Sequence, residues 1–230
     1  MATISVVFDF DGTLVTSFIG GLLFRGFTPE AELEKASNRF KTNVTSLREY
    51  QEEVFDLVSE STAEMSKRAV EGASIRSQAH EVCEHIWNVG GKVAIASAGL
   101  DFYIQPVLDN SKLGRINVHS GKVISNVTEL PPFRYDYPSS DDQCEGDWIT
   151  CKCKVINDMK SEDEEIEVVF VGDGKGPDEC AAKNAADTVF ARGRLLSYCI
   201  ENQIPAMEFG EDFGPVLSYV VNKTSANGAQ

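Results

Sequence analysis

The residues that could carry chemistry are two aspartates, Asp9 and Asp11, directly after the apolar segment 4–8. That segment is rich in β-branched residues and is typical of a buried strand, which Gly12 then ends. Side chains two apart on a strand point to the same side, so two charged carboxylates there would repel each other. A metal cation or an incoming phosphate group would account for the pair. The alternative, an acidic turn without chemistry, stays open on this motif alone.

Two further apolar segments end in polar groups. Residues 92–96 lead into a Ser-Ala-Gly sequence at 97–99, and residues 167–172 lead into Asp173. In open α/β sheets, ligands bind at the carboxyl ends of the strands. We therefore expect the three strands to bring their polar groups together at one edge of a sheet.

This set of motifs and its order resemble the haloacid dehalogenase superfamily of aspartate-based phosphotransferases. The Asp-x-Asp-Gly-Thr sequence at 9–13 carries most of the resemblance, and the Gly-Asp-Gly sequence at 172–174 adds to it. The resemblance extends from about Ile4 to about Arg192. It implies an α/β fold, with a Rossmann-like parallel sheet core and an inserted helical cap.

The same resemblance implies a role for each motif residue. Asp9 would be the nucleophile that forms an aspartyl-phosphate. Asp11 would protonate the leaving alkoxide and then act as the base for the attacking water. Ser97 and the backbone N–H groups near Ala98 and Gly99 would bind phosphate oxygens.

A Mg²⁺ site is implied at the same place, since Mg²⁺ prefers hard oxygen ligands and keeps several waters. Its expected ligands are the carboxylates of Asp9 and Asp173 and the backbone carbonyl of Asp11. Asp178 is a further candidate metal residue. Relatives usually carry a second aspartate one position earlier, so Asp178 is either that residue on a bulged loop or an acid favoured by a helix N-terminus.

Two lysines near the start of a predicted helix, Lys152 and Lys154, are candidates for neutralising the nucleophile. An α-helix turns about 100° per residue, so positions two apart face nearly opposite sides. Lys152 shares its side with the apolar residues three, four and seven positions further on, whereas Lys154 shares its side with polar residues. A buried lysine is unfavourable unless it meets an anion. We expect Lys152 to contact Asp9 and the substrate phosphate; the alternative is that it reaches past the strand ends to water.

The apolar pattern changes after the first strand. From residue 15 to 76 it follows helical periods, and about sixty residues are too many for a single crossover helix. The resemblance points to the helical cap of the phosphoserine-phosphatase-like branch. The expected division is a core at 1–14 and 77–223, a helical cap at 15–76, and a disordered polar tail at 224–230.

Local patterns also predict the elements of the second half. Segments 116–119 and 122–124 alternate in polarity around Ser120-Gly121, which is typical of a hairpin. Residues 131–146 are polar and rich in proline, which predicts an exposed loop. A helix is expected over 147–160.

Three cysteines, Cys144, Cys151 and Cys153, lie close together in the sequence. They do not match a zinc site, which requires a fourth ligand and a spacing such as Cys-x-x-Cys. The Cys-Lys sequence at 151–152 looks like two small-molecule branches of the superfamily, the methionine-salvage enolphosphate phosphatase and the phosphoethanolamine/phosphocholine phosphatase groups. The role of the three thiols stays open.

Composition excludes several classes of partner. The 230-residue chain carries a net charge of −15, whereas nucleic acids and anionic membranes are bound by clustered Lys and Arg. The N-terminus has no basic leader, and no apolar run is long enough for a membrane span. Six cysteines without a secretory signal favour reduced thiols. The expected location is the cytoplasm.

The predicted function is a Mg²⁺-dependent phosphatase, monomeric or homodimeric, that acts on a small phosphorylated metabolite. Two alternatives are a phosphotransferase of the same superfamily and a non-catalytic phosphate-binding module on the same fold. A dehalogenase would not need Asp11, and the intact set of motif residues argues against a module. The organic part of the substrate stays unassigned, because cap side chains that belong to no local motif set it.

Overall fold

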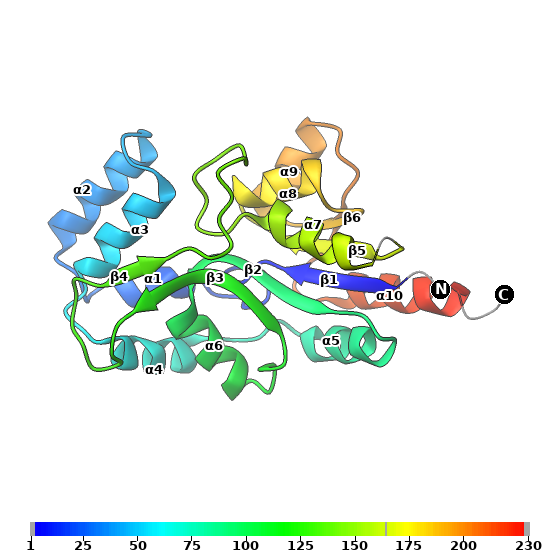
Figure 1. Cartoon of the computed structure of the whole chain (residues 1–230), viewed down its shortest axis with the longest axis horizontal. Helices are drawn as coiled ribbons and strands as arrows, with labels where there is room; N and C mark the ends of the chain where they lie inside the picture. The colour runs from blue at the N-terminus through cyan, green and yellow to red at the C-terminus, as the bar shows by residue number, and fades with distance from the viewer. Residues whose placement is uncertain (1–2, 164, 228–230) are drawn as a thin grey trace.

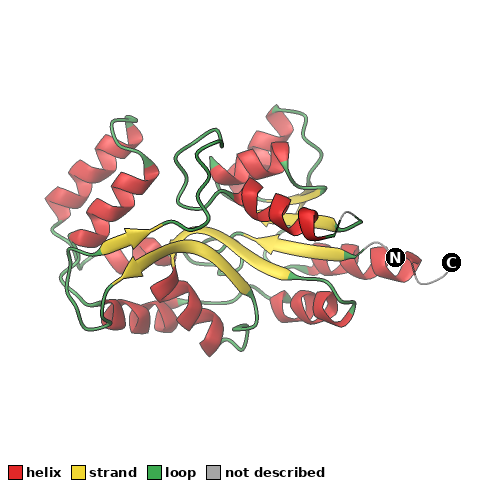
Figure 2. Ribbon diagram, viewed as in Figure 1, coloured by secondary structure: helices red, strands yellow, loops and turns green. Residues whose placement is uncertain are grey.

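The computed structural model describes residues 3–163 and 165–227. Its centre is a seven-stranded sheet in the order β4-β3-β2-β1-β5-β6-β7 (Figures 1 and 2). All neighbouring strands are parallel except β3 and β4, which are antiparallel. The strands are β1 Ile4–Phe8, β2 Val93–Leu100, β3 Asn117–Ile124, β4 Arg134–Asp136, β5 Glu167–Gly172, β6 Thr188–Ala191 and β7 Met207–Glu208. The α/β fold and the parallel core are confirmed.

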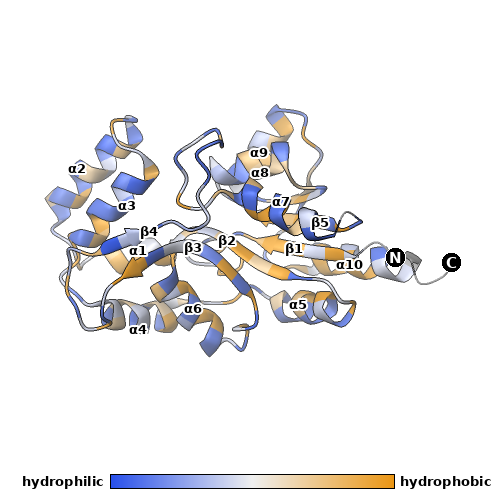
Figure 3. Cartoon of the chain, in the orientation of Figure 1, coloured by the Kyte–Doolittle hydropathy of each residue, from blue (hydrophilic) through white to orange (hydrophobic). Residues whose placement is uncertain are grey.

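Strand β1 lies in the middle of the sheet, and both of its faces are buried. All five of its residues are buried, and it pairs in parallel with β2 on one side and β5 on the other. Such continuous hydrophobic runs are typical of strands covered on both faces. The central strands are accordingly among the most hydrophobic parts of the chain (Figure 3). The loop after β1 thus lies between the loops after β2 and β5.

Helices cover both faces of the sheet. One face packs on α5, α6 and α10 and the other on α7, α8 and α9, and each side has its own buried cluster (Figure 1). The helices are α1 Ile19–Phe24, α2 Glu30–Lys41, α3 Leu47–Asp56, α4 Thr62–Gly72, α5 Ala79–Asn88, α6 Asp101–Asn110, α7 Lys152–Glu162, α8 Pro177–Asn184, α9 Gly193–Glu201 and α10 Gly214–Asn227. Within the described residues, none of them combines the length and hydrophobicity that a membrane span requires.

Four helices, α1 to α4, occupy the insertion between β1 and α5, where the cap is predicted. Helix α4 packs on α6 and on α1, whereas α2 and α3 pack on each other and project at one end of the molecule (Figure 1). Capping boxes begin α3 at Ser46 and α4 at Ser61. The division of the chain into a core and a cap at 15–76 stays a prediction.

The two chain segments that enter and leave this insertion run side by side. Val15 and Ile75 form an antiparallel bridge, and the backbone N–H of Arg76 donates to the carbonyl of Leu14 at 2.8 Å. The buried Arg76 guanidinium also donates to the carbonyls of Thr13 at 2.7 Å and Gly12 at 2.6 Å. The linkers are therefore held to each other and to the loop after β1.

The predicted hairpin at 116–124 is wrong. Residues 117–124 form one strand, β3, which runs parallel to β2, and its antiparallel partner β4 comes from the predicted exposed loop 131–146. Gly121 is needed for close packing and not for a turn: a Cβ there would lie 2.9 Å from Ile149 and from Leu100. A glycine inside a strand often marks such a close approach.

Two helix boundaries also differ from prediction. Helix α7 begins at Lys152 and not at 147, because Cys151 is its N-cap and the N–H of Cys151 bonds to the Ser139 carbonyl. Helix α10 extends to Asn227, so residues 224–227 of the predicted disordered tail are helical. Thr224 and His85 share a hydrogen bond of 2.9 Å that ties this end to α5. Residues 228–230 of the predicted tail lie outside the described part.

Candidate active site

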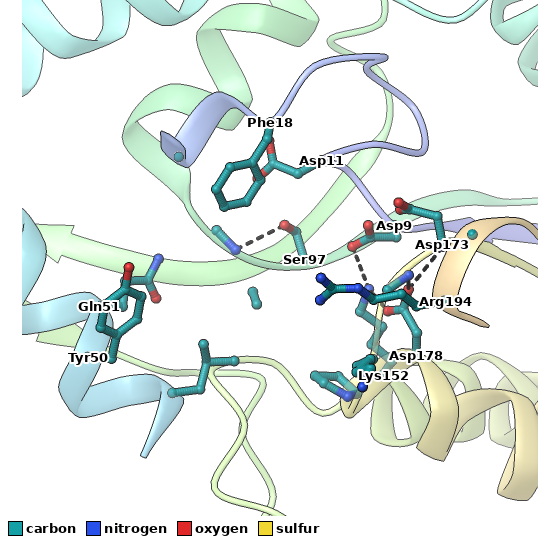
Figure 4. Close-up of a pocket in the computed structure, with 18 of the residues that line it drawn as sticks. Asp9, Asp11, Phe18, Tyr50, Gln51, Ser97, Lys152, Asp173, Asp178 and Arg194 are labelled. Carbon is teal, nitrogen blue, oxygen red and sulfur yellow. Dashed lines mark hydrogen bonds and ion pairs between the residues drawn. The ribbon is translucent and has the colours of Figure 1, made fainter. Parts of the chain in front are cut away.

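The polar groups that follow β1 and β5, together with those near the end of β2, line one pocket of about 430 Å³. Asp9 and Asp11 follow β1, Ser97 lies in the last part of β2, and Asp173 follows β5. Figure 4 shows these side chains around a common space, with Lys152 and Asp178 on the same side as Asp9 and Asp173. The expected meeting of the three strand ends is therefore observed.

Lys152 is the buried cation of this site. Its Nζ lies 2.5 Å from Asp9 Oδ1 and 2.5 Å from Asp178 Oδ1, and its side chain is 2% exposed. Burial disfavours the charged ammonium, but the Asp178 and Asp9 carboxylates outweigh this effect and raise the pKa of Lys152 above its ordinary value. Lys154 points to the other side of α7 and pairs with Asp158. The predicted rotation of the helix is confirmed.

Asp178 uses both carboxylate oxygens on protein partners. Its Oδ1 contacts Lys152, and its Oδ2 accepts hydrogen bonds from the N–H groups of Asp173 at 3.2 Å and Gly174 at 2.8 Å. It lies in the first turn of α8, where a carboxylate is favourable. The late aspartate therefore reaches the site despite its displaced position and links Lys152 to the loop that carries Asp173.

Asp9, Asp173 and Asp178 form a cluster whose ligand atoms lie within 4.8 Å of one another. Thr13 donates a hydrogen bond of 2.8 Å to Asp173. Gly12 has φ 78°, and a Cβ there would lie 2.6 Å from Asp173 Oδ2. Only glycine therefore lets the β1 loop approach the carboxylate so closely.

The cluster holds more negative charge than Lys152 alone offsets. Burial raises the pKa of the Asp9 carboxyl to about 8; the Lys152 ammonium opposes the rise, whereas the Asp178 carboxylate adds to it. A hard divalent cation between Asp9 and Asp173 would remove this conflict, and oxygen donors are the ligands that Mg²⁺ prefers. The donor set therefore fits the predicted metal.

Asp11 turns away from this cluster toward the start of α1. Its Oδ1 accepts a hydrogen bond of 2.6 Å from the Ile19 N–H. Burial raises the pKa of Asp11 to about 7, although the hydrogen bonds from Ile19 and Gly20 oppose the rise. A carboxyl with this pKa is partly protonated near neutral pH, as a general acid must be.

The predicted phosphate donors of β2 are only partly available. The Gly99 N–H donates to Ser97 Oγ at 3.0 Å, so this amide is already used within the loop. Gly99 has a packing role instead, since a Cβ there would lie 2.2 Å from the Tyr103 hydroxyl. The Ser97 hydroxyl can still donate its own proton, and phosphate binding by Ser97 and Ala98 stays a prediction.

The end of the pocket across from Lys152 was not predicted from the sequence. Tyr50 and Phe55 of α3 and Phe24 of α1 make it largely aromatic, whereas Phe18, the residue before α1, lies beside Asp11. Gln51 lies among them and is 7% exposed; in the described part of the chain, nothing donates a hydrogen bond to its Oε1. Figure 4 shows Tyr50 and Gln51 across the pocket from Lys152. Amphipathic spacing made these residues look like ordinary helix packing, so no local signal marked them.

Replacing Lys152 should separate the two lysines experimentally. We expect Lys152→Ala to lower kcat about 10²–10³-fold, similar to the loss of one preorganised donor at a developing anion. Lys154→Ala, on the same helix but on its solvent side, should stay within about twofold, since exposed pairs such as Lys154–Asp158 are weak. Steady-state hydrolysis of para-nitrophenyl phosphate measures both. The reverse ranking would show that Lys152 has only a packing role.

The comparisons with known proteins agree with this geometry. The family model of the haloacid dehalogenase-like hydrolases matches residues 6–178. A 2-hydroxy-3-keto-5-methylthiopentenyl-1-phosphate phosphatase of Bacillus cereus is 26% identical, covering 90% of this chain and 91% of the relative. The enzyme of the same name from Bacillus mycoides is 27% identical, covering 94% and 95%.

A solved structure of similar fold is a phospho-aspartyl intermediate analogue of phosphoserine phosphatase. Its TM-score is 0.69 with 18% identity, and the match covers 95% of this chain and 99% of that one. The chain belongs to the haloacid dehalogenase-like hydrolase family. Within that family it is a phosphatase, similar to the methionine-salvage enolphosphate enzymes in sequence and to phosphoserine phosphatase in fold.

Proposed function

We propose that this protein is a cytoplasmic, Mg²⁺-dependent phosphatase that hydrolyses a small phosphomonoester through an aspartyl-phosphate on Asp9. The observation that carries the proposal is the buried contact of Lys152 with both Asp9 and Asp178, beside Asp173. A lysine held at 2% exposure between two carboxylates serves to bind and neutralise anions. Six free cysteines support a reducing compartment.

In the first step, an Asp9 carboxylate oxygen attacks the phosphorus, and the bond to the substrate oxygen breaks. Asp11 gives its proton to that leaving oxygen. In the second step, Asp11 takes a proton from water as the water oxygen attacks the same phosphorus, which releases inorganic phosphate and restores Asp9. Lys152 and Ser97 bind the phosphoryl oxygens, over which the transition-state charge is spread.

The carboxylates of Asp9 and Asp173 and the backbone carbonyl of Asp11 would hold Mg²⁺. When bound, the ion supplies positive charge that draws the phosphate to the nucleophile and offsets charge in the transition state. Asp178 would position Lys152 and the loop that carries Asp173, since its two carboxylate oxygens contact these groups. Thr13 fixes Asp173 by its hydrogen bond of 2.8 Å.

The pocket favours a substrate with a partly apolar organic group. Aromatic residues of α1 and α3 line the end away from Asp9, and the free Oε1 of Gln51 would accept a hydrogen bond from a substrate hydroxyl or amine. The substrate named for the Bacillus relatives, 2-hydroxy-3-keto-5-methylthiopentenyl-1-phosphate, is a small phosphomonoester of this kind. Residues 15–76 would serve as the cap that covers it.

A panel of phosphomonoesters assayed with Mg²⁺ tests this proposal. We expect kcat/KM to be highest for small esters with a hydroxyl and an apolar chain, and to be lowest for a folded phosphoprotein, which the cap excludes. Gln51→Leu should lower kcat/KM for the hydroxylated esters about tenfold while leaving para-nitrophenyl phosphate nearly unchanged, because only the former carry a hydroxyl that can donate to Gln51 Oε1.

Two results would contradict the proposal. Binding of phosphate without turnover of any ester would favour the non-catalytic module. Transfer of the phosphoryl group to an added alcohol in preference to water would favour a phosphotransferase.

A further inference from the structure

Four thiols lie close together between the start of α7 and α8, although only three of them are close in sequence. The sulfur atoms of Cys144, Cys151 and Cys153 lie within 4.8 Å of one another. Cys180, from the first half of α8, adds a fourth: its Sγ is 3.5 Å from that of Cys144 and 3.2 Å from that of Cys153. The fold therefore brings Cys180 to the position of the fourth ligand, which the spacing of Cys144, Cys151 and Cys153 did not provide.

The three mutually close sulfurs and the two short contacts of Cys180 are near the geometry of one ion bound by four sulfurs; Cys180 Sγ lies more than 4.8 Å from Cys151 Sγ, so a bound ion would draw these two sulfurs together. A tetrahedral zinc site with Zn–S bonds of about 2.3 Å places its sulfur atoms about 3.8 Å apart. Buried thiols do pack as small hydrophobic groups, but such packing gives no reason for four of the six cysteines to converge from a loop and two helices.

The sulfurs also receive hydrogen bonds of the kind that stabilise thiolates. The Lys154 N–H, in the first turn of α7, donates to Cys151 Sγ at 3.4 Å. The Asn184 amide donates to Cys180 Sγ at 3.4 Å. Donors around metal-bound sulfur orient the ligands and offset their charge. These contacts are independent of the sulfur–sulfur distances and point to the same ligand.

We propose that Cys144, Cys151, Cys153 and Cys180 bind a structural Zn²⁺ ion, separate from the carboxylate site. The ion would tie the start of α7 to α8 and to the loop around Cys144. Lys152 lies between two of the ligands, and Asp178 is two residues before a third. The zinc would therefore fix the two helices whose side chains form the 2.5 Å Lys152–Asp178 contact.

Metal analysis of the full-length protein, purified without chelators or added zinc, tests the site without reference to turnover. We expect about one zinc ion per chain in the wild type, as a closed four-cysteine site predicts. Replacement by Co²⁺ should give the thiolate-to-cobalt charge-transfer absorption of a tetrahedral sulfur site. Cys144→Ser, in the loop, and Cys180→Ser should each lower the zinc content at least tenfold.

Two controls locate the ion. Cys83→Ser changes a buried cysteine on the other face of the sheet and should keep the zinc. Asp173→Asn changes the carboxylate site and should also keep it; loss of zinc in that variant would place the ion in the active site and overturn the proposal. A zinc-free wild type with six titratable thiols would overturn it as well. So would a disulfide between Cys153 and Cys180, detected as a mass lower by two hydrogens.

Discussion

Asp9→Asn should lower the turnover of para-nitrophenyl phosphate by at least about 10⁴-fold, the scale seen when a covalent nucleophile is removed. The amide has nearly the shape of the carboxylate but cannot attack phosphorus, so the loss is chemical and not structural. No acid-stable phosphoenzyme should form with a radiolabelled ester, and circular dichroism should confirm that the variant folds.

Asp11→Asn is the matched control for this experiment. It also removes one carboxylate from the same loop, but it should leave the nucleophile intact. With an activated leaving group, which needs little acid help, this variant should still form the phosphoenzyme and then hydrolyse it slowly. A beryllium fluoride adduct should appear on Asp9. An adduct on Asp11 instead would reverse the two roles.

Removal of Mg²⁺ should have an effect nearly as large. A metal that offsets transition-state charge contributes several kcal/mol, which corresponds to about 10³-fold or more in rate. Chelation by EDTA should therefore nearly abolish hydrolysis, and added Mg²⁺ should restore it. Full activity after exhaustive chelation would contradict the metal dependence.

The chelation experiment needs a control, because EDTA could also remove the zinc ion that we propose at the four cysteines. Zinc content measured in the same samples distinguishes loss of Mg²⁺ from loss of zinc. A variant at Asp173 should require more Mg²⁺ for half-maximal activity without losing zinc. If chelation abolishes activity and Mg²⁺ restores it while the zinc content stays constant, the two metals have separate roles.

The parts of the site that could be predicted are those with a local signal. The buried parallel strands are continuous apolar runs, so their ends located Asp9 and Asp173. Helical rotation, together with the apolar residues on one side of the helix, favoured Lys152 over Lys154. These inferences need only neighbours in sequence, which is why the structure agrees with them.

The parts that were missed depend on contacts between distant segments. Strand β4 has three residues and forms only because β3 offers it an edge. Cys180 is separated from Cys144 by 36 positions, so no spacing rule connects them. Gln51 lies on a helix whose apolar pattern indicates packing, and its place in the pocket is set by how α3 faces the strand ends.

The paired linkers of the α1–α4 insertion restrict how this enzyme can open. Arg76 joins both linkers to the loop after β1. This contact restricts a rigid-body hinge motion of the whole insertion about its linkers. Two polar contacts join α3 to the chain around β4 and to the loop before α7, Tyr135 with Asp56 at 2.7 Å and Arg48 with Asp147 at 2.8 Å, while the buried Phe55 packs α3 on Phe24 of α1. Water can replace such bonds at about 0.5–1.5 kcal/mol each. We expect substrate entry to involve tilting of α2 and α3 on the Phe24–Phe55 contact, while the loop after β1 keeps its position.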